Sequence, residues 1–229
     1  MITEGQQAWV LYKRPSGDTS AQVTFFLREK GVVSALCKGG RTPKKQSLLQ
    51  AFTPLWLTFD VRRDWHYVRD LDVMAQSLQL TGDSLFAGLY VNEILYHGLH
   101  QLDPCPALYD AYVQTMQIFL KNPERLEIEA ALRRFEWQFL STCGYECSLT
   151  HEAHTSMPIM PDHYYNFIAG EGCVLARKGI SGDCILAMAE DKLDDPTVLK
   201  AAKWMMRRAI DHALDGKRIK ARELYQRQP

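Results

Sequence analysis

Residues 6–37, QQAWVLYKRPSGDTSAQVTFFLREKGVVSALC, decide the fold of this chain. The stretch contains three short runs rich in β-branched and aromatic residues, and turn signals such as RPSGD at 14–18 separate them. Runs of this length and composition between turn residues are typical of β-strands. We therefore expect strands at residues 7–12, 21–27 and 31–37.

The β pattern continues to about residue 75. Residues 52–59, FTPLWLTF, alternate Leu and Phe with Trp56 and Thr58, and residues 65–73 complete the set. Five short strands at this spacing suit a small antiparallel barrel, for which the five-stranded OB-fold is the natural candidate. We predict an OB-fold DNA-binding domain over residues 1–80.

The hydrophobic period changes beyond residue 80. A helix-start signal at 81–84 precedes amphipathic helices at 108–120 and 127–142, and a last helix is expected from Asp195 to about Leu214. Glycines and prolines break the pattern over residues 143–183, which we expect to be irregular. The predicted fold class is α+β, with the barrel followed by an all-helical domain at 81–229 that contains this segment.

Charge is distributed unevenly along the 229 residues, although 27 basic and 27 acidic residues leave no formal net charge. Residues 1–80 carry 11 Lys and Arg against 7 Asp and Glu, and residues 200–229 carry 9 against 3. Residues 81–199 carry only 7 against 17. Basic ends around an acidic middle indicate different partners for different segments, with a polyanion favouring the ends.

Catalytic and targeting signals are missing from the sequence. It contains no GxSxG, HExxH or Walker loop, so we expect no enzymatic activity. The start, MITEGQQAWVLYKRP, lacks the basic and apolar regions of a signal peptide, and no apolar run is long enough to cross a membrane. We therefore expect a cytoplasmic, nucleoid-associated protein with reduced thiols.

The cysteines lack the CxxC pairs of a structural zinc site. Three histidines, His151, His154 and His163, lie in the same region and could supply ligands. We nevertheless expect buried or idle thiols, and no metal or other cofactor. The six cysteines are Cys37, Cys105, Cys143, Cys147, Cys173 and Cys184.

Basic residues at both ends of the chain are candidate contacts to DNA. The loop KGGRTPKK at 38–45 holds four cations and no acid, and cations of this kind bind phosphates by releasing counterions. The alternatives are a solvated hairpin loop and, for the C-terminal tail, a disordered basic segment. The candidates are Lys13, Arg14, Arg28, Lys30, Lys38, Arg41, Lys44, Lys45, Lys217, Arg218, Lys220 and Arg222.

Aromatic residues are interleaved with arginines near the last predicted hairpin. Trp65, His66 and Tyr67 lie between Arg62, Arg63 and Arg69. This arrangement suits single-stranded nucleic acid, because bases stack on rings while cations follow the phosphates. Taken one by one, however, Trp56, Trp65 and Tyr67 are expected to belong mostly to the core.

Several segments together resemble the bacterial RecO family of recombination mediators. They are CKGGRTPKK, QAFTPLWLTF, GLYVNEILYHGLHQLDPCPALYDAY, LRRFEWQFLSTCGYE and LKAAKWMMRRAIDHALDGKRIKARELY, which occur in family order over nearly the whole chain. The resemblance implies an OB-fold, binding of single- and double-stranded DNA, strand annealing, and association with RecR. It also implies binding to the C-terminal tail of single-stranded DNA-binding protein (SSB), which helps RecA to load. A protein adaptor with incidental DNA contacts is the alternative.

An acidic SSB tail with an apolar terminal residue requires cations beside an apolar groove. The predicted helix at 127–142 and the last helix could supply both. The alternative is that the arginines pair with Glu127, Glu129 or Glu136 at helical spacing. The candidate residues are Arg133, Arg134, Phe135, Lys203 and Arg207. Some family members carry a four-cysteine zinc module, and this sequence lacks its CxxC pairs, so we expect packing to replace the metal.

Overall fold

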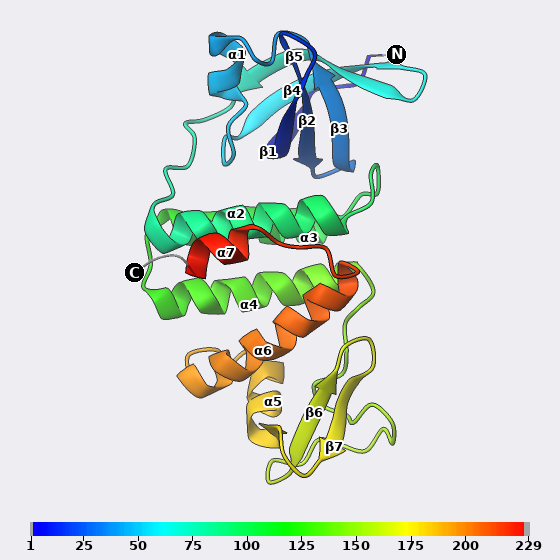
Figure 1. Cartoon of the computed structure of the whole chain (residues 1–229), viewed down its shortest axis with the longest axis vertical. Coiled ribbons are helices and arrows are strands. Elements are labelled where there is room, and N and C mark those ends of the chain that lie inside the picture. Colours follow the sequence, from blue (N-terminus) through cyan, green and yellow to red (C-terminus); the bar gives the residue numbers. More distant parts are fainter. Residues whose placement is uncertain (1, 227–229) are drawn as a thin grey trace. The chain divides into compact units, whose positions relative to one another are not determined.

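The computed structural model describes residues 2–226, and its N-terminal part is a closed five-stranded barrel (Figure 1). The strand order around the barrel is β1-β2-β3-β5-β4. Neighbouring strands are antiparallel except β3 and β5, which run parallel. The predicted five-stranded OB-fold is therefore confirmed. The strands are β1 (Gln6–Ser16), β2 (Ser20–Leu27), β3 (Gly31–Cys37), β4 (Leu55–Arg62) and β5 (Trp65–Val73).

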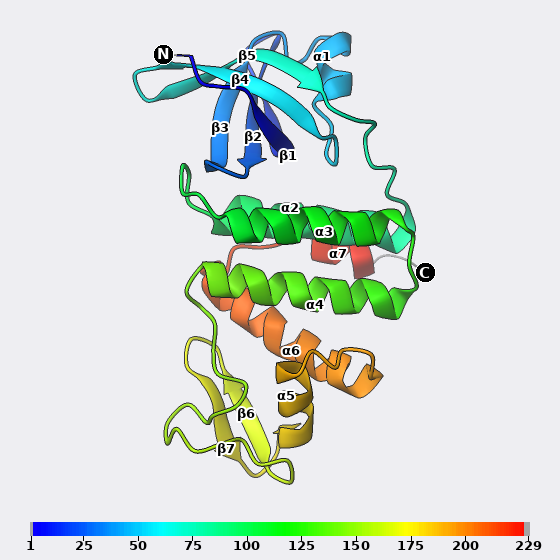
Figure 2. The ribbon, with the colours of Figure 1, turned by 180° about the vertical axis from the view of Figure 1, so that it is seen from behind.

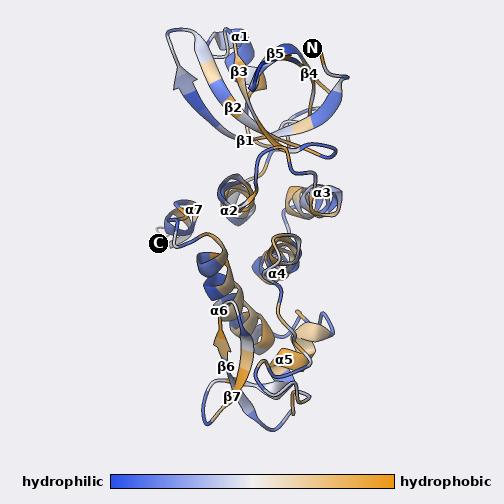
Figure 3. Ribbon diagram, turned by 90° about the vertical axis from the view of Figure 1, so that its right-hand side faces the viewer, coloured by the Kyte–Doolittle hydropathy of each residue, from blue (hydrophilic) through white to orange (hydrophobic). Residues whose placement is uncertain are grey.

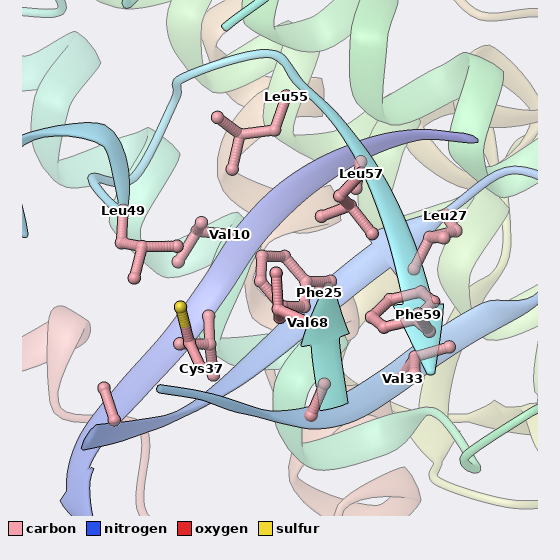
Figure 4. Close-up of a cluster of buried hydrophobic side chains, with 14 residues drawn as sticks. Val10, Phe25, Leu27, Val33, Cys37, Leu49, Leu55, Leu57, Phe59 and Val68 are labelled. Atoms are coloured by element: carbon pink, nitrogen blue, oxygen red, sulfur yellow. The ribbon is translucent and has the colours of Figure 1, made fainter. Parts of the chain in front are cut away.

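Alternate residues of all five strands fill the interior of the barrel (Figure 4). Phe25 and Phe59 are its largest buried side chains, and their rings meet edge to face with centroids 6.1 Å apart. Val10, Leu57 and Val68 pack around them. The alternation of Leu and Phe with Trp56 and Thr58 that indicated β4 in the sequence is thus the alternation of buried and less buried side chains on this strand.

A short helix interrupts the stretch between β3 and β4. Helix α1 (Pro43–Leu48) begins with Pro43, whose fixed φ and missing N–H suit the first turn of a helix. The sequence predicted only a loop here. Six residues give too little periodicity for a helix to be recognised.

Three helices complete the first compact unit, which comprises Met1–Asn122 and the chain from Ile219 onward. Trp9 of β1 donates its indole N–H to the Tyr109 hydroxyl over 3.1 Å, and Asn92 donates to the Val10 carbonyl. Because these contacts tie helices to the barrel, the first unit extends past residue 80. The helices are α2 (Gly82–Gly98), α3 (Pro106–Leu120) and α7 (Ala221–Gln226).

The second compact unit, Pro123–Arg218, combines helices with a small sheet (Figure 2). Residues 143–183, expected to be irregular, contain all three strands of this sheet, whose order is β7-β6-β8. The predicted last helix is confirmed, and Asp195 caps it by accepting from two backbone N–H groups. The elements are α4 (Arg125–Thr142), β6 (Tyr164–Ile168), β7 (Gly172–Ala176), β8 (Ile180–Ser181), α5 (Gly182–Ala189) and α6 (Pro196–Ala213).

The described helices include none that is both long enough and apolar enough to span a membrane.

Candidate functional site

The loop at 38–45 lies against the β1–β2 hairpin at one end of the barrel. The backbone N–H of Arg41 donates to the Thr19 carbonyl over 2.9 Å. The Arg41 guanidinium donates to the carbonyls of Gly17 and Asp18 over 2.9 and 3.0 Å. Arg41 therefore fixes the position of the loop relative to the hairpin.

The four cations of this loop fall into two pairs. Lys45 donates to the Lys38 carbonyl over 2.8 Å and closes the loop on itself, whereas Arg41 ties the loop to the hairpin. The side chains of Lys38 and Lys44 are exposed, and neither has a hydrogen bond or ion pair among the described residues. Two cations thus shape the loop and two are presented to solvent.

Lys13 and Arg14 lie beside this loop but are oriented differently. Lys13 is in register with the core residue Val23, and its ammonium donates to the Leu49 carbonyl over 2.7 Å. Partial burial lowers the pKa of Lys13. Arg14 is exposed and donates twice to the Gln22 side chain. Of the two, Arg14 faces solvent and Lys13 closes the end of the barrel.

Arg28 and Lys30 lie at the other end of β2, roughly 25 Å away for an eight-residue strand. Arg28 donates to both oxygens of Asp110 on α3 over 3.0 and 2.8 Å, and these bonds raise its pKa further. Burial and the charge of Lys30 together lower the pKa of His66. The structure therefore separates these two candidates from the loop cluster and gives Arg28 an internal carboxylate partner.

Two tryptophans of the barrel are exposed, contrary to the expectation that they belong to the core. Trp65 is 62% exposed at the β4–β5 turn, and Trp56 is 45% exposed on β4. The Arg62 guanidinium lies 5.8 Å from the centroid of the Tyr67 ring and pairs with Asp60. The barrel therefore presents aromatic surface as well as charge to solvent.

The basic C-terminal segment is ordered over its described part. The backbone N–H groups of Lys220 and Ala221 donate to the Glu93 carboxylate on α2 over 2.9 and 2.8 Å. The Arg222 guanidinium lies 5.6 Å from the centroid of the Tyr90 ring. Lys217 and Arg218 belong to the second unit and have internal partners. The candidate cations of this segment are thus divided between the two units.

A pocket of about 470 Å³ lies in the second unit, among α4, α5, α6 and the segments next to them. Arg133 and Arg134 line it together with apolar side chains, and their role in tail binding stays a prediction. Phe135 does not line the pocket and is buried, while Lys203 and Arg207 are exposed outside its lining. The other lining residues are Trp137, Leu149, Thr150, Met188, Ala189, Asp191, Leu193, Ala202 and Met206.

Both arginines of the pocket have carboxylate partners. Arg133 is 7% exposed and pairs with the buried Glu136 over 2.6–2.7 Å, which is the internal pairing that the helical spacing allowed. Arg134 is half-exposed and holds Asp191, over 2.8 and 2.9 Å. The sequence gave no signal for this last contact, because Asp191 reads as part of the acidic cluster before α6.

Two of the cysteines, Cys147 and Cys173, lie close together in the second unit. Burial raises the pKa of Cys147 to about 11 and that of Cys173 to about 12, so both thiols stay protonated at neutral pH. Within residues 2–226 no group of three or more His, Cys, Asp or Glu side chains is placed to hold a metal ion. That the protein contains no zinc remains a prediction.

These features define a class of protein. A closed OB-type barrel with a basic loop and exposed aromatic residues is an architecture that binds nucleic acids. A second unit with an arginine-lined pocket accompanies it.

Comparison with known proteins identifies the family. The family models "Recombination protein O N terminal" and "Recombination protein O C terminal" match residues 1–76 and 79–223. A protein of Legionella pneumophila (strain Lens) is 52% identical over 98% of this chain and 99% of its own length. Proteins of Coxiella burnetii (strain RSA 493) and Actinobacillus pleuropneumoniae serotype 7 are 30% and 34% identical over at least 96% of both chains. All three are named DNA repair protein RecO, and the chain belongs to this family of DNA repair proteins.

Proposed function

We propose that this protein binds single- and double-stranded DNA, anneals complementary strands, and with RecR helps RecA to load on SSB-coated DNA. The observation that supports this most directly is the loop at 38–45, which presents Lys38 and Lys44 to solvent while Arg41 and Lys45 hold its shape. A positioned loop keeps its cations in place for phosphates without losing conformational entropy on binding. We also propose a domain boundary near residue 80, with an OB-fold DNA-binding domain at residues 1–80 and a helical domain at residues 81–229.

Removing the two exposed lysines tests the loop. The variant Lys38→Ala/Lys44→Ala is expected to lower the salt dependence of oligonucleotide binding by about 1.4 in log–log slope, since each single-strand phosphate contact contributes about 0.7. Fluorescence anisotropy with oligo(dT), titrated at several salt concentrations, measures the slope. The quadruple variant that also removes Arg41 and Lys45, which hold the shape of the loop, should lose more, up to about 2.8 if all four cations contact phosphate.

A matched control removes the same charge from the second unit. Arg177→Ala/Lys178→Ala also takes away two positive charges, from exposed residues that are not candidate DNA contacts. Its slope should stay close to that of the parent. An unchanged slope in the loop variant would show that the loop does not contact phosphate.

The pocket of the second unit is our candidate receptor for the acidic C-terminal tail of SSB. A terminal carboxylate requires a cation, and an apolar last residue requires an apolar wall, and the pocket offers Arg134 beside Met188, Leu193 and Met206. Arg134 is half-exposed and pairs with Asp191, which is itself exposed. An incoming carboxylate can therefore replace Asp191 at little cost.

Arg134→Ala is expected to weaken binding of a tail peptide by about 1.5–3 kcal/mol, the range for a hydrogen bond to a charged group. Affinity for naked DNA should change much less. Arg207→Ala serves as the control, because Arg207 lies on α6 outside the pocket lining. Anisotropy titrations with the peptide and with an oligonucleotide measure both effects, and parental peptide affinity in Arg134→Ala would place the receptor elsewhere.

A further inference from the structure

The outer face of α6 carries a basic stripe that the pocket does not use. Four cations and no acid occur between residues 200 and 208. Lys200, Lys203, Arg207 and Arg208 are all exposed, and Trp204 among them is 39% exposed. Counted from Lys200, the other four residues follow after three, four, seven and eight positions, so all five share one side of the helix. We call these five residues the α6 stripe.

The opposite side of α6 explains why this stripe faces solvent. Leu199, Met205, Met206 and Ile210 are buried in the second unit. Figure 3 shows the hydrophilic residues of this helix in blue. An amphipathic helix whose apolar side is buried must present its other side to water. The exposure of the stripe is therefore a consequence of packing, whereas its charge is not required by the fold.

Internal contacts neutralise only part of this charge. Lys203 pairs with Glu129 of α4 over 3.0 Å. The Arg208 guanidinium lies 4.2 Å from the centroid of the Trp204 ring, which leaves its charge in place. In the part of the chain that the structure describes, the side chains of Lys200 and Arg207 have no hydrogen bond or ion pair. An otherwise acidic region of the chain thus presents a concentrated positive surface.

We propose that the α6 stripe is a second contact to single-stranded DNA, separate from the barrel. The stripe extends over about 12 Å from residue 200 to residue 208, at 1.5 Å per residue. At about 3.4 Å per stacked nucleotide this length matches three to four nucleotides. Cations at this spacing follow a phosphate backbone, and the Arg208 guanidinium, which lies over the Trp204 ring, offers a plane on which an unpaired base can stack.

This proposal rests on the proposed function only in taking DNA as the ligand. Annealing requires that one protein, or two copies of it, hold two strands at once. A barrel site in the first unit and a stripe in the second would give each chain two separate places for a strand. The stripe also accounts for Lys203 and Arg207, which the tail-binding pocket leaves outside its lining.

The test uses the full chain with the variant Lys200→Ala/Arg207→Ala/Arg208→Ala. Alanine favours helix, and all three side chains are exposed, so α6 should remain folded, which circular dichroism will check. Loss of three phosphate contacts should lower the salt slope for oligo(dT) by about 2. Trp204→Ala should weaken binding of oligo(dT) on the order of fivefold or more, and binding of duplex much less, because duplex bases are already stacked.

The matched control Arg177→Ala/Lys178→Ala/Lys192→Ala removes three exposed cations from the same unit outside the stripe. It should bind oligo(dT) and anneal strands like the parent, whereas the stripe variant should anneal more slowly. If both triple variants lost oligo(dT) affinity equally, the loss would come from the change in net charge alone, and the proposal would be overturned.

Two further outcomes separate this proposal from that for the barrel. Parental DNA binding in the stripe variant, together with a lowered slope in Lys38→Ala/Lys44→Ala, would overturn the stripe and leave the barrel site standing. Weaker binding of an acidic tail peptide by the stripe variant, with unchanged DNA binding, would assign α6 to a protein partner and also overturn the proposal.

Discussion

Arg133→Ala is expected to lower the free energy of unfolding by about 3–5 kcal/mol, the cost of leaving a buried charge without its partner. Arg133 is 7% exposed and Glu136 is 1% exposed, and the two side chains meet over 2.6–2.7 Å on α4. Removing the guanidinium takes this ion pair away from the Glu136 carboxylate, which is 1% exposed. Urea denaturation followed by circular dichroism measures the change.

Two comparisons show whether burial is the cause. Arg134→Ala breaks the half-exposed pair with Asp191 and should cost at most about 1 kcal/mol. Replacing both members of the buried pair, as in Arg133→Met/Glu136→Leu, should recover most of the lost stability, because no charge is then left buried. A parental denaturation midpoint for Arg133→Ala would show that Glu136 is solvated after all.

This expectation also affects how the pocket is tested. A loss of peptide binding in Arg133→Ala could follow from a disturbed α4, whereas Arg134 lies at the exposed side of the same pocket. The sequence alone does not distinguish the neighbouring residues Arg133 and Arg134. Only the packing of α4 separates a buried structural residue from a candidate ligand-binding residue.

The barrel could be predicted from the sequence because its signals are local. Each strand is a short run rich in β-branched and aromatic residues, and turn residues separate the strands. The sheet in residues 143–183 was missed because its strands are short and long-range contacts hold them. Glu152, for example, accepts from the backbone N–H groups of His154, Thr155 and Leu175. Such a contact leaves no periodicity in the sequence.

The candidate DNA contacts were predictable as a set but not one by one. A β-bulge between Val10 and Tyr12 shifts the register of β1, so that Lys13 lies opposite Val23 and turns toward the core. Arg28 finds its partner 82 residues away on α3. Neither effect can be read from charge patterning. Conversely, the exposure of Trp65 follows from its place at a hairpin turn, which was a usable signal.

Phe25→Ala should destabilise the protein about as strongly as Arg133→Ala, by about 3–5 kcal/mol, for a different physical reason. Phe25 is fully buried inside the closed barrel, where its ring meets Phe59 edge to face (Figure 4). Removing the ring leaves a cavity in a barrel whose strands are joined on both sides and cannot easily collapse. The same denaturation experiment measures the loss.

Trp65→Ala is the informative control for the core variant, because it also removes a large aromatic side chain, but from a position that is 62% exposed. Its stability should stay within about 0.5 kcal/mol of the parent. If bases stack on this ring, its affinity for oligo(dT) should fall by about 1–3 kcal/mol. Phe25→Ala should show the opposite pattern, with reduced stability but nearly parental affinity at temperatures where the variant is still folded. Equal stability losses in the two variants would contradict the assignment of Phe25 to the core and of Trp65 to the surface.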